Sequence, residues 1–377
     1  MSAGGALPEH ERLERDPRVV LTLDAGGTHL VFAAMRGARE MAPPITMAAA
    51  ADDRAASLSA LVDGFQRLRE QAGTPDAISF AFPGPANYPA GIVGGAHNLP
   101  AFAGGVALGP MLQDRFGVPV FINNDGGLFA FGEALAGFLP WVNRLLAEAG
   151  SPRRCRSLFG ATLGTGFGGG IICDGRPYVG VNGAAGEVWA MRHKLEGAHC
   201  VEDGVSIRAV RQEYARRAAG DAQPPLDPRE IFEIAEGRRP GDRAAAAEAF
   251  RRLGEVAGDA LADVMTLLDA PIVLGGGLSA AASLFLPALV AEMNGRLRCA
   301  GREVPRTDLT AFNLEDPADR RRFLACDARE VEVPGSGRKV RDEASRRIAV
   351  GLSRLGTSRA TALGAYAVAV EALDLRH

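Results

Sequence analysis

Two short apolar segments, each interrupted by a glycine-rich turn, lie about 140 residues apart in the chain. Residues 19–23 form an apolar run that pauses at Asp24-Ala25-Gly26-Gly27-Thr28 and resumes over 30–33. Residues 158–173 repeat this order, with the glycine-rich turn at 164–170. A strand, a glycine turn and a second strand predict a β-hairpin. The repetition predicts two related halves with a cleft between them.

The segments between and after these hairpins alternate between strand and helix patterns. Apolar runs that end at proline, glycine or asparagine predict strands at 77–82, 118–122 and 272–274. Helical spacing of apolar residues predicts helices at 128–139, 228–235, 244–268 and 360–373, the last one capped by Thr357-Ser358. We therefore expect an α/β fold.

At 377 residues the chain is too long for one ordinary core and suits two domains. We expect a disordered leader at 1–17, an N-terminal α/β domain at 18–138 and a C-terminal α/β domain at 139–359. Residues 301–345 are charged with short alternating runs, and we expect them to form an appended hairpin or insertion.

Composition narrows the class of protein. A hydrophobic content of 47% and a charged content of 23% are typical of a soluble globular protein. The net charge of −3 does not indicate the positively charged surface that binds nucleic acid. The uncharged stretch 270–290 contains Pro271 and Gly275-Gly276-Gly277, which favour a strand, a loop and a helix over a membrane span. With no apolar leader and no paired cysteine motif, we expect a cytoplasmic protein.

The glycine turns are candidates for phosphate binding. Gly164, Gly166 and Gly169 match a dinucleotide-binding spacing, but the β-branched residues that follow predict a strand where that motif needs a helix. Backbone N–H groups of a glycine turn can still form an anion nest. The predicted nests are Gly26-Gly27-Thr28 and Gly164-Thr165-Gly166. A carboxylate beside a phosphate needs a cation between them, so Asp24 predicts Mg²⁺, held through water.

Asn124-Asp125 follows the predicted strand at 118–122 and opens the next helix. Open α/β sheets place their ligand contacts at this end of a strand. Asp125 alone has two interpretations, a plain helix N-cap or a base that orients a hydroxyl and accepts its proton during phosphoryl transfer.

Taken together, the ordered motifs resemble those of the bacterial ROK sugar kinases, within the actin-like ATPase superfamily. The matching pieces are Asp24-Ala25-Gly26-Gly27-Thr28, Phe82-Pro83-Gly84-Pro85, Asn98-Leu99-Pro100, Asn124-Asp125 with Glu133, the run 163–169, Gly186-Glu187, Leu274-Gly275-Gly276-Gly277 and Ala362-Leu363-Gly364-Ala365. The resemblance implies a two-domain actin-like ATPase (ribonuclease H-like) fold with an interdomain cleft. It also implies that the C-terminal helix, 360–377, completes the first domain.

The resemblance assigns roles that the residues alone leave open. Asp125 matches the catalytic base aimed at the sugar 6-hydroxyl. The implied sugar contacts are Gly84, Asn98, Asn124, Asp125 and Glu187. Gly276 and Gly277 match the turn that approaches the adenosine. The implied reaction transfers the γ-phosphate of Mg-ATP to O6 of glucose or a related hexose such as mannose or N-acetylglucosamine, in a homodimer that binds neither nucleic acid nor membrane.

One region departs from the family pattern. Many ROK members carry a zinc site, but here Ala190, His193 and Leu195 stand at three ligand positions and only Cys200 remains. Structural zinc takes four N or S ligands, so we predict no zinc. His193 and His199 are then expected to be surface or loop residues. Glu202 keeps its spacing and stays a possible sugar ligand, while Trp189 is either a core residue or a wall of the sugar pocket.

Two other functions fit the sequence less well than a sugar kinase. A ROK-type repressor places a DNA-binding segment before the first phosphate turn, where this chain has 23 residues without the pattern of two helices. An actin-like filament or chaperone ATPase has no use for Asn124-Asp125 or Gly186-Glu187. The choice among glucose, mannose, N-acetylglucosamine and fructose stays open, because the contacts around C2 fall in the departed region.

Overall fold

The computed structural model describes residues 9–25, 29–49, 53–84, 86–94, 100–218, 226–325, 328–343 and 345–376. The chain divides into two compact units. The first unit comprises Met1–Gly137, Gly170–Gly186 and Arg354–His377, and the second comprises Phe138–Gly169 and Glu187–Ser353. Each is described separately below.

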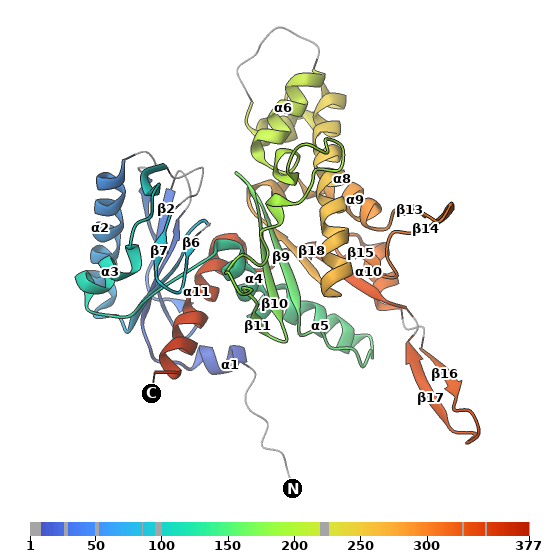
Figure 1. Ribbon diagram of the computed structural model, residues 1–377, viewed down its shortest axis with the longest axis horizontal. Coiled ribbons are helices and arrows are strands. Elements are labelled where there is room, and N and C mark those ends of the chain that lie inside the picture. Colours follow the sequence, from blue (N-terminus) through green and yellow to red (C-terminus); the bar gives the residue numbers. More distant parts are fainter. Residues whose placement is uncertain are drawn as a thin grey trace. The chain divides into compact units, whose positions relative to one another are not determined.

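A six-stranded sheet forms the centre of the first unit (Figure 1). Its strands are β1 (Val20–Ala25), β2 (His29–Arg36), β3 (Arg39–Glu40), β4 (Ile45–Ala48), β5 (Ala77–Ala81) and β8 (Val120–Asn123), in the order β3-β2-β1-β5-β8 with β4 paired to β2. Strands β1, β5 and β8 are parallel. Helices α2 (Arg54–Ala72) and α3 (Leu108–Phe116) lie on one side of the sheet, and α11 (Thr357–Asp374) lies on the other.

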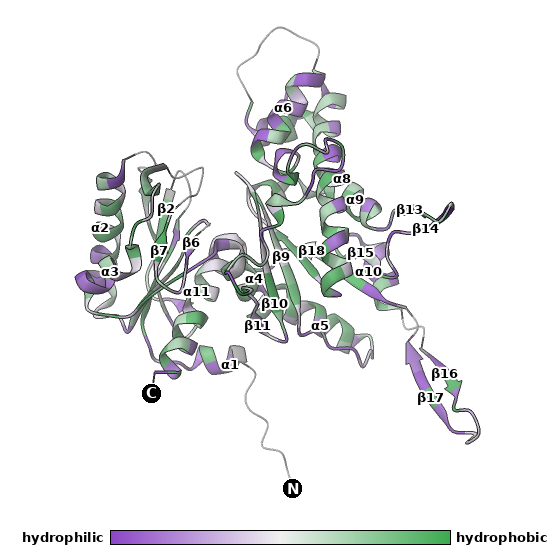
Figure 2. Ribbon diagram, viewed as in Figure 1, coloured by the Kyte–Doolittle hydropathy of each residue, from purple (hydrophilic) through white to green (hydrophobic). Residues whose placement is uncertain are grey.

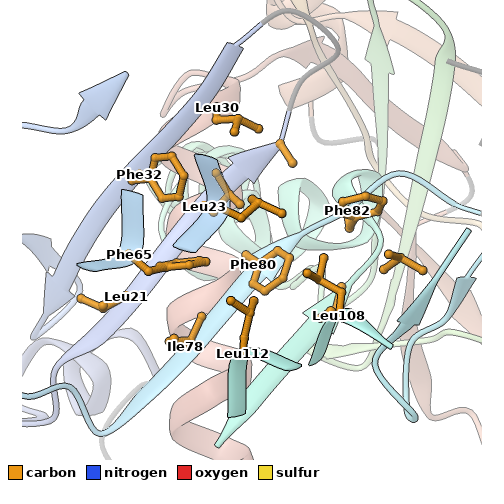
Figure 3. Close-up of a cluster of buried hydrophobic side chains, with 14 of the residues drawn as sticks. Leu21, Leu23, Leu30, Phe32, Phe65, Ile78, Phe80, Phe82, Leu108 and Leu112 are labelled. Atoms are coloured by element: carbon orange, nitrogen blue, oxygen red, sulfur yellow. The ribbon is translucent and has the colours of Figure 1, made fainter. Parts of the chain in front are cut away.

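Every residue of β5 is buried, which is the usual consequence of helices covering both faces of a parallel sheet. On the side of α2, aromatic rings form the centre of the core (Figure 3). Phe65 of α2 lies 5.2 Å from Phe32 and 5.8 Å from Phe80, measured between ring centroids. Burying one such side chain contributes roughly 1.5–3 kcal/mol, so these rings fix α2 on the sheet.

On the other side of the sheet, α4 (Asp125–Leu135) packs closely against α11. The approach requires glycine, because a Cβ at Gly132 would clash with the backbone of α11 and one at Gly364 with the backbone of α4. The buried Glu133 carboxylate accepts hydrogen bonds from the N–H groups of Arg354, at 3.2 Å, and Leu355, at 3.1 Å. Glu133 thus fixes α4 to the segment that leads into α11.

A second six-stranded sheet has the order β11-β10-β9-β12-β18-β15. Its strands are β9 (Leu158–Leu163), β10 (Phe167–Cys173), β11 (Arg176–Pro177), β12 (Ile272–Gly275), β15 (Thr310–Asn313) and β18 (Arg347–Leu352). From Gly170 onward, β10 and its partner β11 belong to the first unit. In the second unit, β12 runs parallel to both β9 and β18, and helices α8 (Arg243–Leu268) and α9 (Ala282–Met293) pack on each other.

Shorter elements complete the described chain. They are the helices α5 (Phe138–Glu148), α6 (Ile207–Arg217), α7 (Pro228–Ala235) and α10 (Pro317–Leu324), the 3₁₀ turns η1 (Pro100–Phe102), η2 (Val188–Ala190), η3 (Val201–Asp203) and η4 (Gly277–Ala281), and the two-stranded pairs β6 (Ala86–Asn87) with β7 (Ile92–Val93), β13 (Arg296–Cys299) with β14 (Arg302–Pro305), and β16 (Ala328–Glu332) with β17 (Lys339–Glu343). The expectation of an appended hairpin or insertion at 301–345 is wrong for β15, which pairs with β18 in the second sheet. The β16–β17 hairpin in this segment is mostly hydrophilic (Figure 2).

Two expectations about the ends of the chain were wrong. The predicted disordered leader includes residues 9–14, but these residues form helix α1 (Glu9–Glu14). Its Leu13 is buried, and its Arg12 pairs with Asp374 at 2.7 Å. The last helix starts after Gly356, so Thr357-Ser358 lies in its first turn and is not its cap. No helix in the described ranges is long and apolar enough to cross a membrane.

Candidate functional site

Four of the predicted site residues lie at one edge of the first unit's sheet. Asp24 pairs with Ala81 of β5, and Ala81 pairs with Asn123 of β8. Because these strands are parallel, their carboxyl ends meet at the same edge, the usual location of ligand contacts. Asp24, Gly84, Asn124 and Asp125 all stand at or just beyond these strand ends. Predicted site residues 26–28 and 98 lie outside the described residues.

The start of α4 separates the two interpretations of Asp125. Asn124 is the N-cap, with extended backbone angles and a side-chain Oδ1 that accepts the Gly127 N–H at 3.0 Å. Asp125 is the first helical residue, and its Oδ1 accepts the N–H of Gly126 at 2.9 Å. The capping role therefore belongs to Asn124. Asp125 places a carboxylate at the positive end of the helix dipole, which favours its negative charge.

Tyr88, which follows β6, was not singled out from the sequence. Its hydroxyl donates to the Phe82 carbonyl at 3.0 Å and accepts from Asn124 Nδ2 at 3.5 Å. The side chain thereby links the residue after β5 to the residue after β8. A cavity of about 600 Å³ has Tyr88, Asn124 and residues of 177–185 among its lining.

Asp24 is a mostly buried carboxylate near the end of β1. Burial raises the pKa of the Asp24 carboxyl, and a hydrogen bond with Ser358 in the first turn of α11 offsets part of that effect. Among the described residues, no group of three or more His, Cys, Asp or Glu side chains forms a metal cluster. A single buried carboxylate does fit the predicted role of Asp24, because Mg²⁺ keeps several waters and takes few protein ligands.

In the second unit, the predicted phosphate turn joins β9 to β10. The Gly164 N–H donates to the Gly166 carbonyl at 3.0 Å, and Thr165 at the tip is exposed. A Cβ at Gly164 would meet open space, whereas a Cβ at Gly166 would clash with the carboxylate of Glu202. One side of the turn is therefore accessible and the other is occupied by Glu202.

The second glycine turn of this unit packs against the first. Gly276 has a φ of 87°, and a Cβ there would clash with the carbonyl of Leu163, the residue before the phosphate turn. A Cβ at Gly277 would meet nothing within 4 Å. The Ser279 hydroxyl donates to the Gly276 carbonyl at 2.6 Å and holds the turn. The structure thus brings together the predicted nucleotide residues 164–166 and 276–277.

The two predicted sugar contacts of the second unit have partners. Glu202 Oε2 accepts the Phe167 N–H at 3.0 Å, at the first residue of β10. The half-buried Trp189 donates its indole N–H to Glu187 Oε2. The sequence predicts Trp189 to be a core residue or a pocket wall, and the structure shows its direct hydrogen bond to Glu187, a predicted sugar ligand.

The two histidines of this region differ. His199 is exposed, as expected, and lies 3.0 Å from Asp203. His193 lies in a loop, which is one of its two expected placements, and is only 4% exposed. The absence of zinc stays a prediction.

The two α/β units form the two-domain actin-like ATPase fold, and the comparisons with known proteins agree with it. The ROK family model matches residues 20–318, so the chain belongs to the ROK family. It is 29% identical over 274 residues to an N-acetyl-D-glucosamine kinase of Photobacterium profundum, covering 68% of this chain and 83% of the relative. It is 49% identical to a glucokinase structure from Parabacteroides distasonis, with a TM-score of 0.83, covering 95% of this chain and 99% of that chain.

A third comparison supports the fold alone. A ROK glucokinase from Streptomyces griseus, solved in complex with glucose and AMPPNP, is 22% identical, with a TM-score of 0.61 over 94% of this chain and 99% of that chain.

Proposed function

We propose that this chain, a sugar kinase of the ROK family, transfers the γ-phosphate of Mg-ATP to the 6-hydroxyl of a hexose. The proposal rests mainly on the arrangement of residues at the start of α4. There Asn124 takes the capping role, which leaves Asp125 as a carboxylate at the ligand-binding edge of the sheet. The names of two relatives, an N-acetyl-D-glucosamine kinase and a glucokinase, support a hexose as the acceptor.

In the proposed reaction the chain contributes a base and positioning groups. The Asp125 carboxylate accepts the proton of the sugar hydroxyl as that oxygen bonds to phosphorus and ADP leaves. Mg-ATP, when bound, supplies the phosphoryl group and part of the charge neutralisation that its transfer needs. Because this transition state is mainly stabilised by position and charge, a carboxylate fixed at a helix start suits the role.

The remaining contacts form two sets. Hydroxyls of the sugar are assigned to Gly84, Asn98, Asn124, Glu187 and Glu202. The nucleotide is assigned to residues 26–28, 164–166 and 276–277, with Asp24 on Mg²⁺ through water. The accessible faces of Gly164 and Gly277 support this assignment, since a Cβ at either would fill space that a phosphate or ribose needs.

A coupled assay of ADP release with ATP and glucose, N-acetylglucosamine, mannose or fructose tests the proposal and identifies the sugar. We expect Asp125→Asn to lower kcat by about 10²–10⁴-fold while sugar and ATP still bind. The matched control is Asp53→Asn at the N-cap of α2, where asparagine preserves the cap. Phosphorylation of none of the hexoses would reject the function, and near-normal kcat in Asp125→Asn would remove Asp125 from the base role.

A further inference from the structure

His193 is the one buried side chain in an otherwise exposed surface segment. Residues 192 and 194–199 are all exposed, whereas His193 is 4% exposed. Its imidazole occupies a narrow slot, because a Cβ at Gly204 would clash with its Nε2 atom and would also contact Val256 of α8. A polar ring in such a place needs hydrogen-bond partners for its burial to be tolerated.

Those partners are backbone N–H groups of its own loop. His193 Nδ1 accepts from Leu195 N–H at 3.1 Å and from Glu196 N–H at 3.0 Å. An imidazole nitrogen accepts only when it carries no proton, so this network assigns the neutral tautomer with its proton on Nε2. The His193 N–H also donates to the His199 carbonyl, at 3.0 Å. The loop is therefore folded around the ring.

The two ends of this loop meet next to two predicted sugar contacts. Arg192 and Cys200 form an isolated antiparallel bridge, and the Val201 N–H donates to the Met191 carbonyl at 2.7 Å. Glu187 lies just before this closure, at the start of η2. Glu202 lies just after it, within η3. The closed loop 191–201 therefore sets the spacing between the two glutamates.

The loop is also held on the helices behind it. The Lys194 ammonium lies 3.1 Å from Glu255 of α8 and 2.6 Å from Glu292 of α9. These pairs are partly exposed, and exposed ion pairs contribute little. The imidazole is the stronger constraint, because its ring is buried and its Nδ1 accepts from two backbone N–H groups.

We propose that His193 is a positioning residue for sugar binding. Its unprotonated Nδ1 folds residues 193–196 within loop 191–201, and this fold supports the backbone closure that holds Glu187 and Glu202 for the sugar. This inference rests on the proposed kinase function for its effect on activity, but the closure of the loop is testable without it.

The test compares His193→Asn with His193→Leu. The asparagine side-chain oxygen can replace Nδ1 as acceptor, whereas leucine fills the slot without an acceptor. We expect His193→Leu to raise the sugar KM about tenfold or more, the effect of roughly 1.4 kcal/mol, and His193→Asn to stay within about threefold of wild type. His199→Asn, at an exposed histidine, is the matched control.

Three outcomes separate the alternatives. A merely structural role would lower the active fraction, and hence kcat, in His193→Leu with an unchanged sugar KM, which would overturn the proposal. Stoichiometric zinc in purified protein, with the sugar KM rising after treatment with a zinc chelator, would also overturn it. If wild type phosphorylates no hexose, the proposed function fails, and hydrogen exchange of residues 191–201 in His193→Leu still decides whether the ring closes the loop.

Discussion

Glu202 Oε2 accepts a hydrogen bond from the Phe167 N–H, over 3.0 Å. Phe167 is the residue directly after the turn 164–166, to which we assign phosphate. On the other side of that turn, the Gly164 carbonyl accepts the N–H of Ile207, at 2.8 Å. One segment, residues 202–207, therefore holds both ends of the turn. A group assigned to the sugar is thus hydrogen-bonded to the residue directly after the turn assigned to the nucleotide.

This contact predicts different effects for two substitutions of Glu202. Glu202→Ala removes the acceptor for Phe167 N–H, so we expect the KM for both ATP and sugar to rise, each by about tenfold. Glu202→Gln keeps an amide oxygen that can accept the same N–H, so we expect an ATP KM near that of wild type and a raised sugar KM. Steady-state kinetics with each substrate varied in turn measures both values. Equal ATP KM values in the two variants would show that the contact does not support nucleotide binding.

The two glycines after β12 predict a contrast between folding and binding. Gly276→Ala forces a Cβ against the Leu163 carbonyl at a φ of 87°, so we expect a loss of stability of about 1–3 kcal/mol. Gly277→Ala meets open space in the free protein, so we expect a near-normal Tm and a raised ATP KM. Thermal unfolding measures the stability of both variants, and steady-state kinetics with ATP varied measures the KM. A normal ATP KM for Gly277→Ala would exclude close approach of the nucleotide at that position.

Tyr88 provides a prediction for the first unit. Tyr88→Phe keeps the ring but removes the hydroxyl that bonds the Phe82 carbonyl and Asn124 Nδ2. Because Asn124 caps the helix that begins with Asp125, we expect kcat to fall by about three- to tenfold and the sugar KM to rise by a similar factor. Tyr178→Phe is the control, since Tyr178 lines the same cavity but is 53% exposed. Equal kinetics in the two variants would contradict a role for the Tyr88 hydroxyl.

Much of the fold could be predicted because local pattern and burial coincide. The strand expected at 77–82 is the fully buried β5, and the helix expected at 228–235 is α7, whose Asp227 and Glu230 form a capping box. The end of the helix expected at 128–139 was harder to predict, because α4 ends at Leu135 and α5 begins at Phe138. The apolar spacing of these two helices runs on without a break across that gap.

Contacts made by single side chains across long sequence separations could not be predicted. Glu133 was noted as part of a motif, but its bonds to residues 354 and 355 depend on how α4 packs on α11. His193 was expected to be a surface or loop residue because the zinc site of the family is missing its other ligands. Its burial depends on Gly204 and Val256, and the spacing of residues in the sequence does not predict that these two lie beside it. The sequence could indicate which residues bind the substrates, but not which side chains fix the position of those residues.

The buried imidazole finally predicts a pH dependence of stability. Burial lowers the pKa of His193 below its usual 6.5, with Arg252 and His199 lowering it further and Glu196 and Asp203 opposing them. Arg208, Glu213 and Arg216 line the same pocket. A lowered pKa means that the folded state binds the proton less readily than the unfolded state. The stabilisation is therefore complete above about pH 6.5 and is lost as the pH falls through the folded-state value.

We expect the free energy of unfolding, measured with urea at pH 7.5 and 5.5, to fall more for wild type than for His193→Asn. Asparagine keeps the acceptor and does not titrate, so the difference between the two proteins isolates His193 from the other groups that change charge over this range. His199→Asn should follow wild type, because the part of His199 that bonds within the loop is its backbone carbonyl, which asparagine keeps. The same pH dependence in wild type and His193→Asn would show that the neutral ring does not hold residues 191–201.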